Sequence, residues 1–282
     1  MCGRYTLHQK AQALKSYYHL KALPNGLKDN FNVAPGQFMP VILNKDGETE
    51  LEMMKWGLVP VWAKDPSIGY KLINARDDTI FSKPVWRNII LRQRCLIPAD
   101  GFYEWQKITA LDLRKALHPS GCTQADLKYV LSERKVSVDT LKEEKHISGS
   151  LVKSEGAGIL RKSSLASKEQ KQPFYIKPKQ ADLFSFAGVW ETRKDVEGLE
   201  LKTYSIITTS PNKEMKTIHN RMPVILHQED YASWLEPSLS SKSDIAPFLR
   251  PYEDNELEIY KVSKNVNTAR NNSAELIYPI SI

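Results

Sequence analysis

The stretch RCLIPADGFYEWQ, residues 94–106, contains two short strand-like runs, RCLIPA and FYEWQ, and sets the expectation for the fold. Upstream, LEMMKW has the same character, and from residue 173 onward strand candidates recur at close spacing: PFYIK, FSFAGVWE, KTYSIITT, PVIL and ELEIYKV. Many short strands interrupted by Pro and Gly are typical of strand-rich domains. We therefore predict an α/β chain of the α+β type, one strand-rich domain spanning 1–282 with a mixed or antiparallel sheet and short helices.

Three segments predict the helices of this domain. Residues 8–19 have the apolar spacing of an amphipathic helix. The segments SPNKEMKTI and EDYASWLE have the composition of short helices, and Ser210 is the expected N-cap of the first.

Residues 108–170 differ from both of their flanks and predict an insertion into the domain. They contain the helix-like runs ALDLRKAL, DLKYVL and VDTLKEEK, followed by a tail rich in Gly, Ser and Lys. Residues 107–171 hold 13 Lys and Arg against 8 Asp and Glu, an excess of +5 within a chain of net charge +7. The bordering segments EWQK and KQPFYIK are both strand-like, so we expect a hairpin whose tip carries the insertion, because loop tips tolerate added length.

The composition indicates an intracellular protein with an anionic partner. The chain has 282 residues, 41% hydrophobic and 26% charged, with a sequence pI of about 9.1. A basic balance favours polyanions such as nucleic acid. Three cysteines do not predict a disulfide framework, and neither a membrane span nor a signal peptide is evident. We expect a location in the cytoplasm or nucleoid of a bacterium, or in the nucleus of a eukaryote.

The N-terminal run Met1-Cys2-Gly3 suggests an unusual nucleophile. An initiator Met is commonly removed before a residue as small as Cys, which would expose an α-amine beside a thiol. The amine has a reference pKa of about 7.7–8.0 and the thiol about 8.5. An amine condenses with an aldehyde to an imine, and the neighbouring thiol then closes a five-membered thiazolidine ring. By itself, a Cys that follows the initiator Met more often has no functional role.

Several longer motifs accompany the N-terminus. MCGRYTL, FNVAPGQ, MKWGLVPVWAK, INARDDT, RCLIPADGFYEW, QPFYI, FAGVWE, ITTSPN and IHNRMPVIL occur in that order. Each of these segments alone is ordinary, but the ordered set resembles the SOS-response-associated peptidase (SRAP) family, the abasic-site processing proteins. The resemblance covers roughly residues 1–107 and 171–282, outside the insertion.

The resemblance implies a protein of the DNA damage and SOS response that senses abasic sites in single-stranded DNA. It implies that Cys2, after removal of Met1, forms a covalent thiazolidine crosslink that protects the lesion. Asn74 would orient the cysteine, and Glu104 and His219 would carry protons in lyase-type chemistry. The implied DNA-binding residues are Arg4, Trp62, Arg76, Thr208 and Arg221, although Val61 stands where many members have a second aromatic residue.

Two other functions remain open at this point. Cys, His and Asn side chains also occur in cysteine peptidases, and self-removal of Met1 is a suggested activity of the family. Arginines and tryptophans would suffice for a noncatalytic single-strand binding module. We expect no metal, because Cys95, Cys122 and the six His lack ligand spacing, and no other cofactor. We expect a monomer that binds single-stranded DNA with abasic sites and meets the replication machinery, without a membrane partner.

Overall fold

The computed structural model describes residues 2–24, 26–108, 171–194 and 197–280. The chain divides into two units, one formed by Met1–Gln106 with Gln172–Ile282 and the other by Lys107–Lys171. Almost all of the segment 108–170 lies outside the described residues, so its prediction as a basic, partly helical insertion stays a prediction. The described helices and strands belong to the first unit, except for Lys107 and Lys171 at its border.

Strands dominate the described residues, as the sequence predicts. The strands are β1 (Arg4–Leu7), β2 (Asn30–Val33), β3 (Phe38–Lys45), β4 (Glu48–Trp56), β5 (Asn74–Arg76), β6 (Arg94–Ala99), β7 (Gly101–Lys107), β8 (Lys171–Pro178), β9 (Phe184–Lys194), β10 (Glu200–Thr209), β11 (Met222–Pro223), β12 (Ile225–Leu226) and β13 (Leu257–Lys261). Each strand candidate of the sequence falls on one or two of these. Together with the short helices, this arrangement confirms the predicted strand-rich α+β class.

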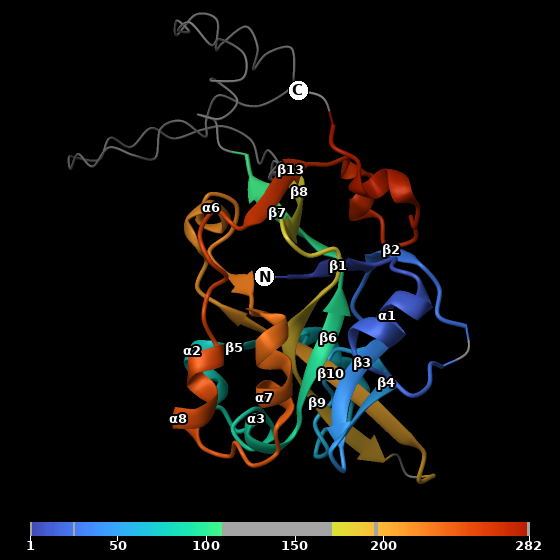
Figure 1. Ribbon diagram of the computed structural model, residues 1–282, viewed down its shortest axis with the longest axis vertical. Coiled ribbons are helices and arrows are strands. Elements are labelled where there is room, and N and C mark those ends of the chain that lie inside the picture. The colour runs from blue at the N-terminus through green and yellow to red at the C-terminus, as the bar shows by residue number, and fades with distance from the viewer. Residues whose placement is uncertain (1, 25, 109–170, 195–196, 281–282) are drawn as a thin grey trace, which may run out of the picture. The chain divides into compact units, whose positions relative to one another are not determined.

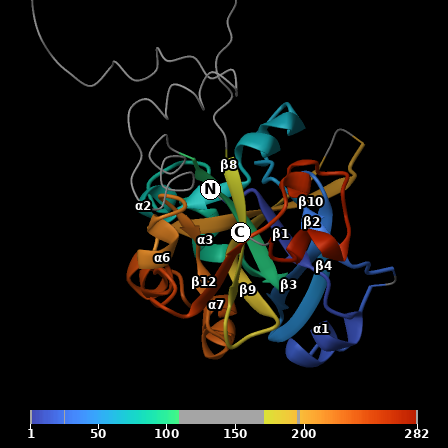
Figure 2. The ribbon, with the colours of Figure 1, turned by 90° about the horizontal axis from the view of Figure 1, so that it is seen from above.

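The helices are short and lie between strands. They are α1 (Ala11–Tyr17), α2 (Asp77–Ile80), α3 (Ile89–Arg92), α6 (Lys213–Lys216), α7 (Tyr231–Leu235) and α8 (Lys242–Ile245), with 3₁₀ turns η1 (Pro66–Lys71), η3 (Gln228–Asp230), η4 (Ala246–Phe248), η5 (Lys264–Asn267) and η6 (Ala274–Ile277). Figures 1 and 2 show α1 beside β4, away from α6 and α7. Among the described residues, no helix is long and apolar enough to cross a membrane.

One helix start differs from its prediction. Ser210 does not cap α6; instead the side chain of Asn212 accepts a hydrogen bond from the Met215 amide at 3.0 Å. The Asn212 side chain also donates to the carbonyls of Tyr252 and Glu253, at 3.2 and 3.3 Å. Asn therefore fills the cap position because its amide can accept from the helix and donate to the neighbouring segment at once.

The strands form two sheets. One has the order β13-β8-β7-β1-β2, and the other runs β11-β10-β4-β3-β6-β9-β12, with β5 paired to β10. Because β10 also pairs with β9, the strands β10, β4, β3, β6 and β9 close into a ring. β7 and β8 are hydrogen-bonded neighbours, as the predicted hairpin requires. Aromatic side chains of this ring pack against Tyr5 of β1, with Tyr5, Trp56, Phe186 and Tyr204 fully or almost fully buried.

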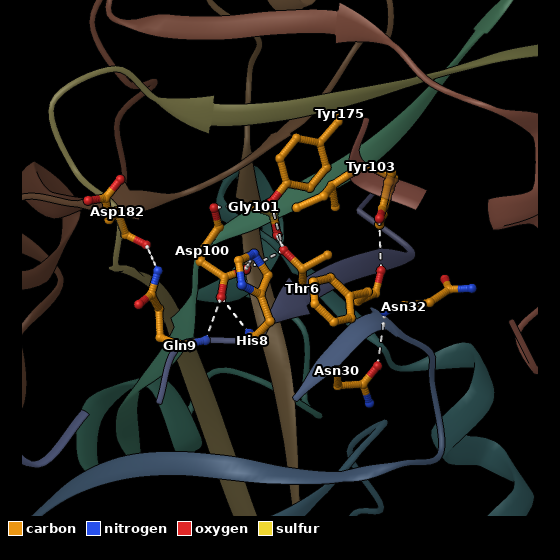
Figure 3. A network of polar contacts seen from close by, with 12 residues as sticks. Thr6, His8, Gln9, Asn30, Asn32, Asp100, Gly101, Tyr103, Tyr175 and Asp182 are labelled. Atoms are coloured by element: carbon orange, nitrogen blue, oxygen red, sulfur yellow. Dashed lines mark hydrogen bonds and ion pairs between the residues drawn. The ribbon is translucent and has the colours of Figure 1, made fainter. Parts of the chain in front are cut away.

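The first strand is held in place at the β6–β7 corner by Asp100. The buried carboxylate accepts hydrogen bonds from the Thr6 hydroxyl and from the backbone amides of His8 and Gln9, the latter two at 2.5 and 3.1 Å (Figure 3). The Tyr175 hydroxyl lies 2.9 Å from the Thr6 hydroxyl and joins the same network. These contacts fix how far β1 extends along β7, and therefore where the residues before β1 lie.

Candidate functional site

The register of β1 against β7 brings Cys2 to Glu104. The strands are antiparallel, with Arg4 opposite Tyr103 and Tyr5 opposite Phe102. Since antiparallel partners step in opposite directions, the residues before Arg4 lie beside those that follow Tyr103. Cys2 is fully buried there, and its thiol lies 3.8 Å from the carbonyl oxygen of Arg4.

Asn74 holds the same cysteine from the second sheet. β5 pairs in parallel with β10, with Asn74 opposite Ile206. The Asn74 side-chain Nδ2 donates a hydrogen bond of 2.9 Å to the Cys2 carbonyl. The other amide atom, Oδ1, is buried and has no hydrogen-bond partner within the described part of the chain. Asn74 thus fixes the cysteine backbone and keeps an acceptor in the site.

Glu104 is a buried carboxyl on β7, which is costly for a charged group. Burial raises the pKa of Glu104, while the positive charges of the chain's amino terminus and of His219 work in the opposite direction. A carboxyl with a raised pKa keeps its proton to a higher pH than an exposed one. Glu104 is therefore suited to donate a proton and to accept it back.

The surroundings of the Cys2 thiol favour its neutral form. Burial raises the pKa of this thiol, and the negative charge of Glu104 raises it further. A thiolate is the usual nucleophile of cysteine enzymes, and it forms where positive charge lowers the pKa. This environment does the reverse, so the thiol reacts only if its proton is removed during the reaction.

His219 follows α6 and is oriented by the backbone around it. Its amide donates to the Met215 carbonyl at 2.8 Å, and its Nδ1 accepts from the Arg221 amide at 3.1 Å. The same Nδ1 also lies 3.2 Å from the Arg221 carbonyl oxygen, so the backbone of Arg221 orients the ring. The His219 charge also acts on the carboxyl of Glu104, which places the two groups in one electrostatic cluster.

Arg221 is anchored by a residue that the sequence did not single out. Its Nη2 donates to Asp77 Oδ1 at 2.6 Å and to the carbonyl of Thr208 at 2.5 Å. Asp77 also accepts from the Thr209 hydroxyl at 2.7 Å. The sequence signal for Asp77 was its place in the INARDDT motif directly after Arg76, where an acid beside an arginine is typical of a surface pair.

The other expected DNA-binding residues differ in their exposure. Trp62 is 63% exposed, and Arg76 is exposed and paired with Asp78, its Nη2 2.5 Å from Oδ2. Arg4 is half-buried, and its Nη1 donates to Asn32 and to the Val266 carbonyl, at 2.7 and 2.9 Å. Thr208 is fully buried, and its backbone carbonyl accepts from Arg221.

The site thus joins Cys2, Asn74, Glu104 and His219 from separate parts of the sequence. Arg221 borders this group through its backbone amide, which donates to His219 Nδ1, while Asp77 and Thr208 hold its guanidinium. No group of three or more His, Cys, Asp and Glu suited to a metal ion occurs among the residues the structure describes. The chemistry that this arrangement supports is proton transfer around a cysteine fixed near the amino terminus.

Comparisons with known proteins find a family model and relatives that agree with one another. A family model described as SOS response associated peptidase (SRAP) matches residues 1–127 and 164–269. The abasic site processing protein YoqW of Bacillus subtilis (strain 168) is 36% identical over 279 residues, covering 98% of this chain and 99% of that protein. YoaM of the same organism is 34% identical, with 98% and 97% covered.

More distant relatives extend the comparison. The abasic site processing protein HMCES of Rattus norvegicus is 28% identical, covering 100% of this chain and 77% of that protein. A crystal structure of a protein from Bacteroides thetaiotaomicron superposes with a TM-score of 0.71 at 26% identity, covering 99% of this chain and 100% of that one. The family model and the two Bacillus relatives span most of the chain, and the fold agrees with them. The chain belongs to the SOS response associated peptidase (SRAP) family.

Proposed function

We propose that this protein processes abasic sites in single-stranded DNA by forming a covalent thiazolidine with Cys2 once Met1 has been removed. The observation that carries the proposal is the hydrogen bond of 2.9 Å from Asn74 to the Cys2 carbonyl, which fixes the cysteine beside Glu104. The names of YoaM, YoqW and HMCES describe abasic-site processing in those proteins and support the same substrate here.

The chemistry needs both groups of the exposed cysteine. The ring-opened sugar of an abasic site is an aldehyde, and the α-amine of Cys2 adds to its carbonyl carbon. Loss of one water gives an imine, and the thiol then adds to the imine carbon while its proton passes to the nitrogen. The net change is one new C–N bond, one new C–S bond and one water released.

The buried groups divide these proton transfers between them. Departure of water from the first adduct needs an acid, and Glu104 with its raised pKa supplies one. The deprotonated carboxylate then accepts the proton of the Cys2 thiol as sulfur attacks. His219, in the same electrostatic cluster, serves as the second proton carrier near the sugar.

The thiol environment favours this route over proteolysis of other proteins. A cysteine peptidase acts through a thiolate, and here burial and Glu104 raise the thiol pKa. In the proposed route the amine reacts first, and the thiol is deprotonated only in the last step. Peptide cleavage by this site is proposed only for the removal of Met1.

DNA binding completes the proposed function. Arg4, Arg76 and Arg221 would contact phosphates, and the exposed Trp62 would stack on a base. Thr208 would contribute by holding Arg221 through its backbone carbonyl.

Intact mass spectrometry tests the proposal. The protein without Met1, incubated with single-stranded DNA containing one abasic site, should gain the mass of the DNA minus one water and survive denaturation. A matched oligonucleotide with a reduced, aldehyde-free site should give no adduct. Equal adduct formation by Cys2→Ala would overturn the proposal.

A further inference from the structure

A second aromatic side chain stands exposed on the loop that carries Trp62. The loop leaves β4 at Gly57 and returns at Leu72, and its two ends touch: the Leu58 amide donates to the Leu72 carbonyl at 3.1 Å. Gly57 and Gly69 face each other so closely that a Cβ on Gly57 would lie 2.6 Å from the Gly69 oxygen. Side chains at this neck would force the ends apart, so the glycines close a compact loop.

The far end of the loop presents Trp62. The Ala63 amide donates to the Pro60 carbonyl at 3.0 Å, which closes a turn with Val61 and Trp62 at its centre. Val61 is 60% exposed and Trp62 63%, while Ala63 is buried. The turn therefore holds the indole out from the surface on a short, hydrogen-bonded support.

Tyr70 stands at the neck of the same loop and is 62% exposed. Its ring edge rests on Gly36: a Cβ built on that glycine would lie 3.0 Å from the Tyr70 hydroxyl oxygen and 3.2 Å from a ring carbon. Gly36 has a φ of +90°, a conformation that favours glycine. The contact steadies the phenol while most of its surface faces solvent.

The turn under Tyr70 also leads to the reactive cysteine. Residues Ala34–Gln37 form it, with the Gln37 amide donating to the Ala34 carbonyl at 3.2 Å. β2 is antiparallel to β1, with Val33 opposite Tyr5, so the chain after Val33 runs beside the chain that leads back to Cys2. Tyr70 therefore stands over the turn that follows β2, the strand paired with β1, and Cys2 lies two residues before β1.

We propose that Tyr70 is a base-stacking residue that binds an unpaired base of the single strand next to the abasic site. The inference rests on the proposed function and adds a second stacking surface beside Trp62. Because residue 61 is Val, the tip of the loop has one aromatic ring, that of Trp62. Every base has a π-face, so an exposed, supported ring binds single strands with little sequence preference. Exposed Lys64 and Lys71 follow the two rings in sequence and suit the phosphates on either side.

The charge of the loop fits DNA better than an apolar protein partner. Its one acidic side chain, Asp65, accepts a hydrogen bond from the Ser67 amide at 2.8 Å. The carboxylate therefore already has a hydrogen-bond partner within the loop. A protein partner would have to cover two lysines along with the rings.

Binding of a lesion-free oligothymidylate, measured by fluorescence anisotropy, tests Tyr70 without the covalent step. Tyr70→Ala should weaken binding about tenfold, at the lower end of the energy of one stacked base. Tyr70→Phe keeps the ring and should bind within about twofold of wild type on that ground. Tyr278→Ala is the matched control, because Tyr278 is 58% exposed on a different segment and should leave affinity unchanged.

A fluorescent base locates the contact. 2-Aminopurine placed on either side of a tetrahydrofuran abasic analogue, which cannot react, should be quenched on binding by wild type and Tyr70→Phe but less by Tyr70→Ala. If Tyr70→Ala binds the strand and quenches 2-aminopurine as Tyr278→Ala does, the proposal is wrong. The same result is expected if the exposed surface binds a protein instead of DNA. Adduct formation with Cys2 is measured separately, so the stacking role of Tyr70 and the covalent role of Cys2 can each fail without affecting the test of the other.

Discussion

The β1–β7 strand pair carries a buried carboxylate at each end, and the two ends behave differently. Asp100 and Glu104 are both buried, and burial raises the pKa of both. Around Asp100 the donors are one hydroxyl and two backbone amides that belong to β1 and the residues after it (Figure 3), and the His8 Nε2 lies 3.4 Å from the carboxylate. Around Glu104 the interacting groups are the Cys2 thiol, the imidazole of His219 and the amino terminus.

The partners of the two carboxylates suit different roles, structural support for Asp100 and proton transfer for Glu104. The hydroxyl and the two backbone amides keep their protons at neutral pH, so these contacts of Asp100 hold the strand, and His8 adds one titratable neighbour. A thiol, an imidazole and an amine all exchange protons, so the Glu104 carboxyl can take part in a reaction. We expect the partners of a buried carboxylate, and not its burial alone, to decide whether it takes part in a reaction.

The largest effect should come from the reactive end of the pair. Cys2→Ala removes the sulfur, so the denaturation-resistant DNA adduct should vanish, while Cys2→Ser should leave at most a labile imine. Denaturing gels before and after borohydride reduction distinguish the two products.

A protein with an uncleaved N-terminal tag retains Cys2 but has no free amine there, so it should form no DNA adduct. Normal crosslinking by such a protein would exclude the thiazolidine route.

Glu104→Gln should slow the chemistry without removing the nucleophile. A positioned proton carrier contributes roughly 10²–10⁴-fold in rate. Because the raised pKa keeps Glu104 protonated to a higher pH, the wild-type rate of the acid-assisted step should fall as pH rises through that pKa. The variant should lack this decline, in rapid-quench measurements at saturating DNA. Weakened DNA binding with an unchanged chemical rate would instead make Glu104 a positioning residue.

Asp100→Ala should affect stability more than chemistry. The substitution leaves two part-buried backbone amides without their acceptor, while the Thr6 hydroxyl keeps the Gly101 carbonyl at 3.3 Å. An unsatisfied group costs about 1–3 kcal/mol when buried, and water reaches these amides in part. We expect a loss of about 2–4 kcal/mol in the free energy of unfolding on that basis. Asp100→Asn keeps one oxygen and should lose less. Urea titration measures both, and an unchanged midpoint for Asp100→Ala would show that the network does not hold β1.

The smallest effect should come from the surface around the site. Arg76 is exposed, and its ion pair with Asp78 stabilises the fold only weakly, so Arg76→Ala should leave the fold intact. Loss of one phosphate contact should weaken single-strand binding about threefold to tenfold and lower the salt slope by about 0.7. Arg250→Ala is the control, since Arg250 is a similarly exposed arginine paired with Asp230 at 3.6 Å. Equal salt slopes for both variants would place Arg76 away from the DNA.

Much of this molecule follows from local sequence. The strand runs are apolar and regularly interrupted, so their positions could be predicted, and the ordered motifs alone pointed to the family. The residues of the proposed reaction were also visible, because Cys2, Asn74, Glu104 and His219 lie within those motifs. The burial of Thr208 and the use of Asn212 in place of Ser210 as a cap were not visible, because several polar residues compete locally for the same role.

Other features exist only in three dimensions. Asp77 holds Arg221 although 144 residues separate them in the chain, and no local pattern encodes such a pair. Tyr70 looks like an ordinary aromatic of a loop until Gly36 is found beneath its ring. The sequence by itself determined the strands, the family and the residues proposed to react, because these depend on side-chain type and spacing. Only the tertiary structure decided which carboxylate faces fixed amides and which faces the cysteine, because that depends on strand register.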